Sequence, residues 1–198
     1  MRRTAFAFLI AAIAAGPAPE KKAGPPPPPP LPPLNAKVVD FARANLGKPV
    51  GDGICITLAV EALREAGARP TPFNITSGDY VWGGPVEDLK DALPGDILQF
   101  RDAVFHGRRP IGRGRTATWH QEYPHHTAVV AKVEQGGKLL TVLHQNVDQQ
   151  GRPESEKGTV QEGTLRMESL QKGGWVKAYR PLPADPPRRP FAEDDPGR

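Results

Sequence analysis

The sequence is poor in cysteine, in aromatic residues and in long apolar runs. Of its 198 residues one is a cysteine, Cys55, and 7% are aromatic. A single cysteine excludes a disulfide framework and the zinc modules that are built from four cysteines. After the first 16 residues no apolar run approaches the roughly 20 residues that a transmembrane helix needs. The composition therefore excludes a membrane-spanning enzyme, and the length fits one domain with tails.

Proline is abundant but unevenly distributed. Ten of the 24 prolines lie in residues 17–33 and six in residues 181–196, which leaves eight for the 147 residues between them. A segment of ordinary composition is thus flanked by two segments that are too rich in proline to pack. We expect a proline-rich linker at residues 17–34, a globular domain at 35–183 and a disordered tail of prolines and charged residues at 184–198.

The first 16 residues have the pattern of a secretory signal peptide. Arg2 and Arg3 precede the almost wholly apolar stretch from Thr4 to Ala15, and Ala12-Ile13-Ala14 offers small residues for cleavage. The alternative is a short membrane anchor that stays attached. We expect a signal peptide at residues 1–16 and an extracytoplasmic, periplasmic or secreted, mature protein. The proline run that follows is interpreted as a stiff polyproline spacer, with a ligand for an aromatic groove as the alternative.

Helical patterns come first in the domain and strand patterns follow. One expected helix has Asn35 as its N-cap, Gly47 as its stop and an apolar face of Val38, Val39, Ala42 and Leu46. A second has an apolar face of Leu58, Ala59, Ala62, Leu63 and Ala66 and is closed by Gly67. Strands are expected at Asp96–Phe100, Thr127–Val133, Leu139–Val147, Thr159–Leu165 and Val176–Arg180. This order predicts an α+β domain, with the helices packed on an antiparallel sheet of about five strands.

Cys55 follows a glycine-rich turn and stands at the start of the second expected helix. Unpaired N–H groups and the positive end of the helix dipole favour a thiolate at such a position, which would lower the pKa of the thiol and make it a nucleophile. The alternative is a small buried apolar residue, because Ile54 and Ile56 flank it.

All five histidines fall between His106 and His144. His126 precedes one expected strand, and His144 stands near the end of the next, which a hairpin joins to the first antiparallel. A hairpin loop with an odd number of residues would place His126 on the same side of the sheet as His144 and Asn146. An even loop would bring Gln145 there instead. The sequence leaves this choice open.

Four motifs occur together in one order along the chain. They are Gly51-Asp52-Gly53-Ile54-Cys55-Ile56-Thr57-Leu58-Ala59, Pro94-Gly95-Asp96-Ile97-Leu98-Gln99-Phe100, His125-His126-Thr127-Ala128-Val129-Val130 and His144-Gln145-Asn146. The set resembles the papain-like superfamily of bacterial cell-wall hydrolases, the NlpC-type and CHAP (cysteine, histidine-dependent amidohydrolase/peptidase) domains. It is still more similar to a CHAP-like domain at the end of some fungal and plant proline-rich proteins. The resemblance covers about residues 38–181.

The resemblance implies a papain-like fold and assigns roles to particular residues. Cys55 would be the nucleophile, His126 the general base and His144 the third, orienting residue, with Asn146 as a competitor for the third place. The backbone N–H of Cys55 would belong to the oxyanion hole. NlpC-type enzymes have Asp before and Ser after the cysteine, and CHAP domains often have an aromatic residue after it, where this chain has isoleucines.

The segment from Arg101 to His120 is interpreted as a long basic loop near the histidine strand. It could grip an anionic polymer, although a merely solvated loop is an equal alternative. Candidate substrate-binding residues are Tyr80, Trp82, Arg108, Arg109, Arg113, Arg115 and Trp119. For Tyr80 and Trp82, packing is the alternative. No nucleic-acid module accompanies the arginines, so nucleic acid is not expected as the main partner. No metal or cofactor is expected, because adjacent His125 and His126 on a strand point apart.

These observations predict a secreted cysteine peptidase or amidase. It would cleave an amide bond through an acyl-enzyme on Cys55. The resemblance implies a peptide bond of the cell-wall peptidoglycan as the leading substrate. The alternative is a catalytically silent domain of the same fold that binds an anionic envelope polymer through its arginine-rich loop.

Overall fold

The computed structural model describes residues 29–70, 79–148 and 153–185. The chain divides into Met1–Pro30 and Leu31–Arg198, and every described element belongs to the second part. The expected signal peptide, the linker up to residue 28 and the tail from residue 186 lie outside the described residues. Within the described ranges, no helix is long and apolar enough to cross a membrane.

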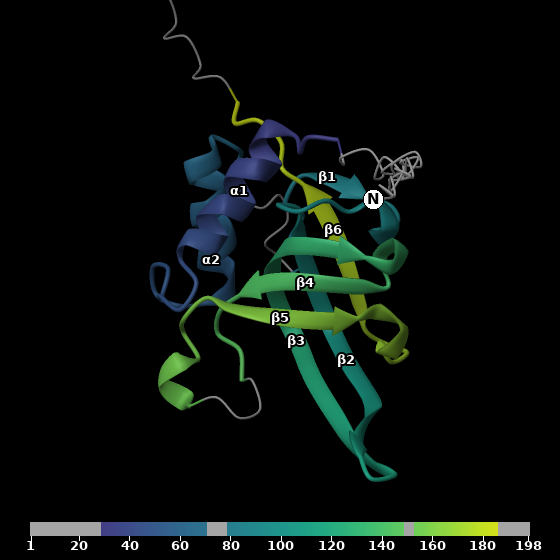
Figure 1. The fold of residues 1–198 in the computed structure, drawn as a ribbon. Helices are drawn as coiled ribbons and strands as arrows, with labels where there is room; N and C mark the ends of the chain where they lie inside the picture. The colour runs from purple at the N-terminus through teal and green to yellow at the C-terminus, as the bar shows by residue number, and fades with distance from the viewer. Residues whose placement is uncertain (1–28, 71–78, 149–152, 186–198) are drawn as a thin grey trace, which may run out of the picture. The chain divides into compact units, whose positions relative to one another are not determined.

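In the part of the chain that the structure describes, two α-helices precede six strands, which form one antiparallel sheet (Figure 1). The helices are α1 (Pro33–Ala44) and α2 (Cys55–Ala66). The strands are β1 (Gly84–Val86), β2 (Ile97–Gly112), β3 (Arg115–Glu134), β4 (Leu139–His144), β5 (Gln161–Arg166) and β6 (Trp175–Arg180). Their order across the sheet is β1-β6-β2-β3-β4-β5, and all pairs are antiparallel. The predicted fold class is confirmed, with one strand more than the five expected.

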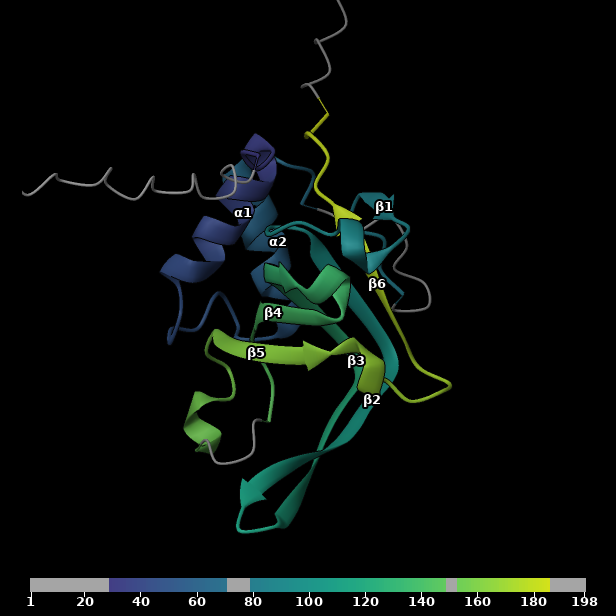
Figure 2. The same ribbon diagram turned by 45° about the vertical axis from the view of Figure 1, so that its right-hand side comes forward.

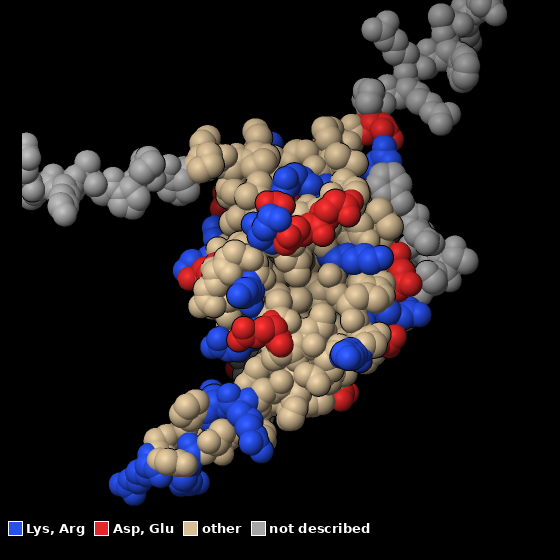
Figure 3. Space-filling view, turned by 90° about the vertical axis from the view of Figure 1, so that its right-hand side faces the viewer, with Lys and Arg blue, Asp and Glu red and all other residues tan. Residues whose placement is uncertain are grey.

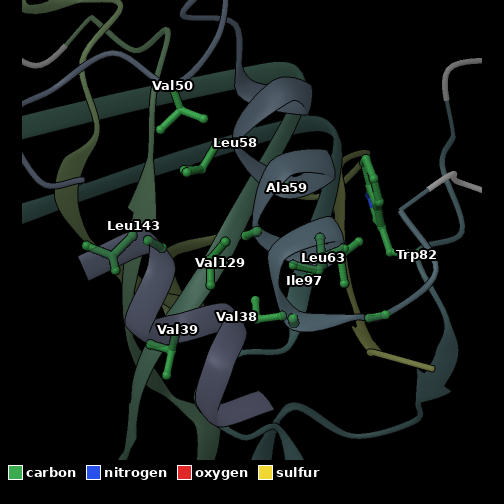
Figure 4. Packing of buried hydrophobic residues seen from close by; sticks show 14 of the residues in the cluster. Val38, Val39, Val50, Leu58, Ala59, Leu63, Trp82, Ile97, Val129 and Leu143 are labelled. Atoms are coloured by element: carbon green, nitrogen blue, oxygen red, sulfur yellow. The ribbon is translucent and has the colours of Figure 1, made fainter. Parts of the chain in front are cut away.

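Both helices pack on one face of the sheet. Successive residues of a strand point to opposite faces, so Ile97 and Val129 face the helices while Leu98 and Ala128 face away. Figure 4 shows the helix-side cluster, in which α1 and α2 contact β2, β3 and β4. The opposite face has an apolar cluster of its own, from β2, β3, β4 and β5. The sheet is therefore buried on both faces over its central part.

Helix α2 matches its prediction, whereas α1 does not begin where expected. Gly67 closes α2 with φ 73°. Helix α1 begins at Pro33, because proline suits the first helical turn, where its missing N–H costs nothing. Asn35 therefore lies inside the helix and is not its N-cap. Leu46 was expected on the packed face, but α1 ends at Ala44 and the Leu46 side chain is 51% exposed.

The Pro-Gly-Asp motif before β2 attaches α1 to the sheet. Buried Asp96 accepts hydrogen bonds from the Asn35 amide at 2.7 Å and from the guanidinium of Arg180 at 3.0 and 3.2 Å. A side chain at Gly95 would lie 2.0 Å from the backbone oxygen of Asn35, so only glycine fits. The motif serves to join three elements that lie far apart in the sequence.

The prediction of a loop from Arg101 to His120 is wrong, because this segment belongs to β2 and β3 and the turn that joins them. Strands β2 and β3 pair from Ile97 and Val129 to Pro110 and Thr116, and the register shifts once before Gly112 pairs with Arg115. The distal half of this hairpin (residues 101–120, the distal hairpin) projects beyond the rest of the domain (Figures 1 and 2). Most of its side chains there are exposed on both faces, so the segment lacks the alternation of apolar residues that marks a half-buried strand.

Candidate active site

Cys55 is the first residue of α2, as the sequence predicts, and its side chain is partly buried. The turn before it needs glycine, because Gly53 has φ 80° and a side chain there would approach the oxygen of Gly158 to 3.1 Å. The Oδ1 atom of Asp52 accepts hydrogen bonds from the Ile54 N–H at 3.2 Å and from the Thr57 hydroxyl at 2.6 Å. These bonds fasten the turn to the first turn of α2 and fix the position of the thiol.

Gln145 holds this turn against the end of β4. Its amide is fully buried and makes three hydrogen bonds. The oxygen accepts the Val50 N–H at 3.1 Å, and the nitrogen donates to the backbone oxygens of Val50 at 2.9 Å and Ile54 at 2.7 Å. The sequence predicts Gln145 only as a possible partner of His126. In the sequence, Gln145 stands directly after an apolar strand pattern, which was the one available sign of a structural role. The residues that it binds are 91 to 95 positions away, so local patterns do not reveal them.

His126 and His144 form a buried pair on the face opposite the helices. The Nε2 atom of His126 and the Nδ1 atom of His144 are 3.1 Å apart. Only 4% of His126 is exposed, and His144 is fully buried. The ring of Tyr123 stacks on His126 at 5.0 Å between centroids, and Phe100 lies 5.5 Å from it. Sequence reasoning did not single out these two aromatic residues, which shield the pair from water.

A β-bulge decides that the two histidines share a face. The turn between β3 and β4, residues 135–138, has four residues, which by itself would put them on opposite faces. The register shifts between Val130 and Lys132, however, and this extra residue restores the odd count. Val129 therefore pairs with Leu143, and His144 falls on the side of His126. The bulge settles the choice that the sequence leaves open.

The thiol of Cys55 lies beside the residue that follows His126. The Val130 N–H donates to the backbone oxygen of Asp96, at the β2 edge of β3. Successive N–H groups of a strand point to alternate edges, so the Thr127 N–H points to the β4 edge. At that edge β4 pairs with β3 only from Val129 onward. The Thr127 N–H lies close enough to the Cys55 sulfur to lower the pKa of the thiol. The nucleophile candidate therefore lies beside the residue that follows His126, at the point where β4 leaves β3.

Burial keeps these groups neutral. Burial raises the pKa of the Cys55 thiol and outweighs the N–H groups of Thr127, Ile56 and Cys55 itself, which lower it. This overturns the expectation that the helix N-terminus gives a net lowering. Burial, and then the neighbouring His144, hold the pKa of His126 well below its usual range, and burial lowers the pKa of His144 to about 4. At neutral pH the resting site contains a thiol and two neutral imidazoles.

Two other candidate residues near these strands, Asn146 and His125, are not part of the histidine pair. Asn146 is exposed in a left-handed conformation, φ 59°, and its N–H donates to the backbone oxygen of Lys157. His144 therefore occupies the place beside His126 for which the two competed. His125 points away from His126, as expected, and contacts Arg101 at the surface.

The candidate substrate-binding residues are not gathered at Cys55. Trp82 is 1% exposed in the helix-side cluster and donates from Nε1 to Gln99 at 3.1 Å, so it packs and presents no surface to a substrate. Tyr80 packs edge-on against Trp82, with centroids 5.7 Å apart. The distal hairpin carries the remaining five, which are Arg108, Arg109, Arg113, Arg115 and Trp119.

A groove of about 1400 Å³ lies between the distal hairpin and β5. Arg108, Arg109 and Trp119 line it from the hairpin, and Gln161 and Gly163 line it from β5. Neither Cys55 nor His126 is among the described residues that line this groove. The groove is therefore separate from the thiol.

Comparison with known families gives one match. The family model of the AIM3/BBC1 cysteine proteinase-fold domain matches residues 34–187, which is most of the chain. No curated protein and no solved structure matches the chain. The matched residues include both helices, all six strands and the site around Cys55. The chain belongs to the family of AIM3/BBC1 cysteine proteinase-fold domains, and its fold is papain-like.

Proposed function

We propose that this domain is a thiol hydrolase that cleaves an amide bond through an acyl-enzyme on Cys55. The observation that carries the proposal is the position of the thiol near the N–H of Thr127, the residue that follows His126, whose ring contacts that of His144. Such an arrangement of nucleophile, base and orienting group is the general requirement for nucleophilic catalysis.

The contact between the two rings supports an assignment of roles to their nitrogens. Because Nε2 of His126 bonds Nδ1 of His144, Nδ1 of His126 is the atom that would accept the thiol proton. The His126 proton then resides on Nε2 and is donated to His144, which is the positioning residue. The neutral resting state of both rings suits this role, since a base must be unprotonated before it acts.

The reaction follows from these roles. His126 takes the proton of Cys55 as the sulfur attacks the carbonyl carbon, and the oxyanion forms near the Cys55 N–H. The carbon–nitrogen bond breaks, the imidazolium of His126 gives its proton to the leaving amine, and a thioester remains on Cys55. Water then attacks the thioester with His126 as base, which releases a carboxylic acid and restores the thiol.

We propose a peptide bond of peptidoglycan as the substrate. We accordingly propose that the protein acts outside the cytoplasm. The support is the kinship of the four sequence motifs with NlpC-type and CHAP domains, which is an analogy and not a property of the site. Transfer of the acyl group to an amine would use the same residues. Ile54, 42% exposed beside the thiol, makes the approach to Cys55 less polar than in the NlpC-type pattern.

The test measures acylation of the only cysteine. The protein is mixed with p-nitrophenyl acetate, nitrophenolate release is followed, and the acetylated residue is identified by mass spectrometry. We expect one acetyl group on Cys55 and a faster reaction near neutral pH than in His126→Ala, in which the thiol keeps its raised pKa but has no base. His125→Ala is the matched control, because the adjacent ring faces away from His126, and it should react like the wild type.

Iodoacetamide alkylation over a pH series separates the proposal from its alternative. If Cys55 is inert until the protein is denatured, or if His126→Ala and the wild type react alike, the hydrolase proposal is wrong. The catalytically silent domain then takes its place. If acylation depends on His126, peptidoglycan fragments and ordinary peptides are compared as substrates.

A further inference from the structure

The distal hairpin carries a concentrated positive charge that the rest of the domain does not neutralise. Between Asp102 and Glu122 the sequence contains four arginines, Arg108, Arg109, Arg113 and Arg115, and no acidic residue. All four are exposed, and none forms an ion pair with any residue in the described ranges. Figure 3 shows Lys and Arg gathered at the projecting end of the molecule, while both signs of charge alternate on the rest of that face.

The backbone conformation of the turn indicates that Arg113 does not stabilise the fold. Arg113 and Gly114 occupy the central positions with φ 50° and 69°, as a type I′ turn requires. Asparagine or glycine is favoured at the first of these positions, and an arginine there is strained. The chain keeps a charged side chain at the tip of the hairpin although the turn itself disfavours it.

An apolar residue stands among the arginines. Ile111 is 47% exposed and lies where the register shifts between Pro110 and Gly112, at the end of β2. Arg108 and Arg109 are successive residues of a paired strand, so their side chains leave opposite faces of the hairpin. Arg108 and Arg109 line the groove beside β5, whereas Arg113 and Arg115 stand beyond it at the turn, so the positive charge extends past the groove to the tip of the hairpin. This arrangement fits a planar partner that the hairpin meets end-on.

We propose that the hairpin tip, residues 108–115, binds the surface of a phospholipid bilayer that contains anionic lipids. The arginines would contact the negatively charged headgroups, and Ile111 would enter the boundary between headgroups and acyl chains. A soluble polyanion would use the arginines but would have no use for an exposed isoleucine at the apex, which is why the observations favour the bilayer. The proposal does not depend on catalysis at Cys55.

Vesicle cosedimentation of the full chain tests the proposal. Vesicles of phosphatidylcholine alone are compared with vesicles that also contain about 30% phosphatidylserine. The apolar stretch from Thr4 to Ala15 can contact either kind, so the readout is the difference between wild type and variants on the same vesicles. We expect binding that requires phosphatidylserine and falls as salt is raised.

The variants separate charge from apolar contact. Arg113→Asn suits the turn and should weaken binding to the anionic vesicles about fivefold, as should Arg115→Gln. Lys37→Gln, which removes one exposed charge from α1, is the matched control and should bind like the wild type. Ile111→Ser should weaken binding to the vesicles but leave binding to heparin, a soluble polyanion, unchanged.

Three outcomes would overturn the proposal. They are equal binding to both kinds of vesicle, an Ile111→Ser variant that binds vesicles as well as the wild type, and a Lys37→Gln variant as weak as Arg113→Asn. The second outcome, together with heparin binding that requires the arginines, would make the hairpin a site for a soluble polyanion.

Discussion

The imidazoles of His126 and His144 are joined through Nε2 and Nδ1 at 3.1 Å, although their residues belong to different strands and lie 18 positions apart. The contact exists because a bulge between Val130 and Lys132 shifts β3 by one residue against β4. Without this residue the two side chains would leave opposite faces of the sheet. A single backbone irregularity therefore decides whether the domain has a histidine pair.

Loss of the His144 side chain should slow the reaction of Cys55. In His144→Ala nothing holds the tautomer and orientation of His126, so the rate of acylation near neutral pH should fall about tenfold or more. His144→Asn offers an amide oxygen to the same Nε2 atom and should recover part of the rate. The measurement is the acylation rate against pH, because a merely structural role would leave the pH profile unchanged. Equal rates in the two variants would exclude the positioning role.

Gly163 of β5 makes room for the ring of His144. A Cβ atom there would lie 2.7 Å from Nε2 and 3.0 Å from Cε1 of that ring, which is fully buried and cannot turn away freely. Gly163→Ala should cost about 1–3 kcal/mol in the free energy of unfolding and should slow acylation of Cys55.

Gly84→Ala is the control for this substitution. Gly84 lies in β1, where a Cβ would meet only a leucine side chain at 3.8 Å. Urea unfolding and acylation of both variants check the prediction. It would be refuted if the two substitutions had the same effect on stability and rate.

Replacing the buried amide of Gln145 by a carboxyl group should loosen the turn before Cys55. In Gln145→Glu an oxygen replaces the nitrogen that donates to the backbone oxygens of Val50 and Ile54. Two hydrogen bonds are lost and an acid is buried, so the free energy of unfolding should fall by about 3 kcal/mol or more.

Asn146→Asp makes the same chemical change at the next residue, which is exposed. It should alter stability by no more than about 0.5 kcal/mol. Urea unfolding at neutral pH compares the two variants. A Gln145→Glu variant as stable as Asn146→Asp would show that the three hydrogen bonds of Gln145 contribute little.

The buried histidines should make the domain sensitive to mild acid. Their folded pKa values are depressed, to about 4 for His144, whereas an unfolded chain has a histidine pKa of about 6.5. As the pH falls below about 6.5 the unfolded state gains protons that the folded state cannot take up. Each such histidine then lowers the free energy of unfolding by up to about 1.4 kcal/mol per pH unit.

Urea unfolding between about pH 7.5 and 4.5 measures this effect in the wild type and in His144→Gln. Apart from His126, whose pKa is lowered partly by His144, the other titrating groups act alike in both proteins, so the difference reports on the histidine pair. The variant should lose less stability on acidification than the wild type. Parallel curves would mean that His144 is protonated as readily in the folded protein as in the unfolded chain.

The local elements and their chemistry could be predicted from the sequence. The apolar face of α2, its closing Gly67 and the glycine turn before it place Cys55 at the start of a helix, and these are short-range features. The strand patterns around His126 and His144 likewise predict neighbouring antiparallel strands. Helix and strand patterns in this order were sufficient for the α+β class, whereas the papain-like fold was implied by the resemblance of the four motifs to a known superfamily.

The distal hairpin and the start of α1 could not be predicted so well. Arg101 to His120 contains glycine, proline and many exposed charges, and an isolated two-stranded ribbon shows no apolar alternation. Asn35 is a residue type typical of N-caps, but it lies inside the helix, and its amide donates a hydrogen bond to buried Asp96. In both cases the structure depends on partners that are distant in the sequence.

The sequence by itself determined the fold class, the nucleophile candidate and the two histidines, because each depends on local periodicity or on residue identity. The tertiary structure alone decided that the histidines meet, that Gln145 holds the turn of Cys55 and that burial raises the pKa of the thiol. These last properties depend on register and solvent exclusion, and a bulge of one residue or the packing of a face changes both without changing any local pattern.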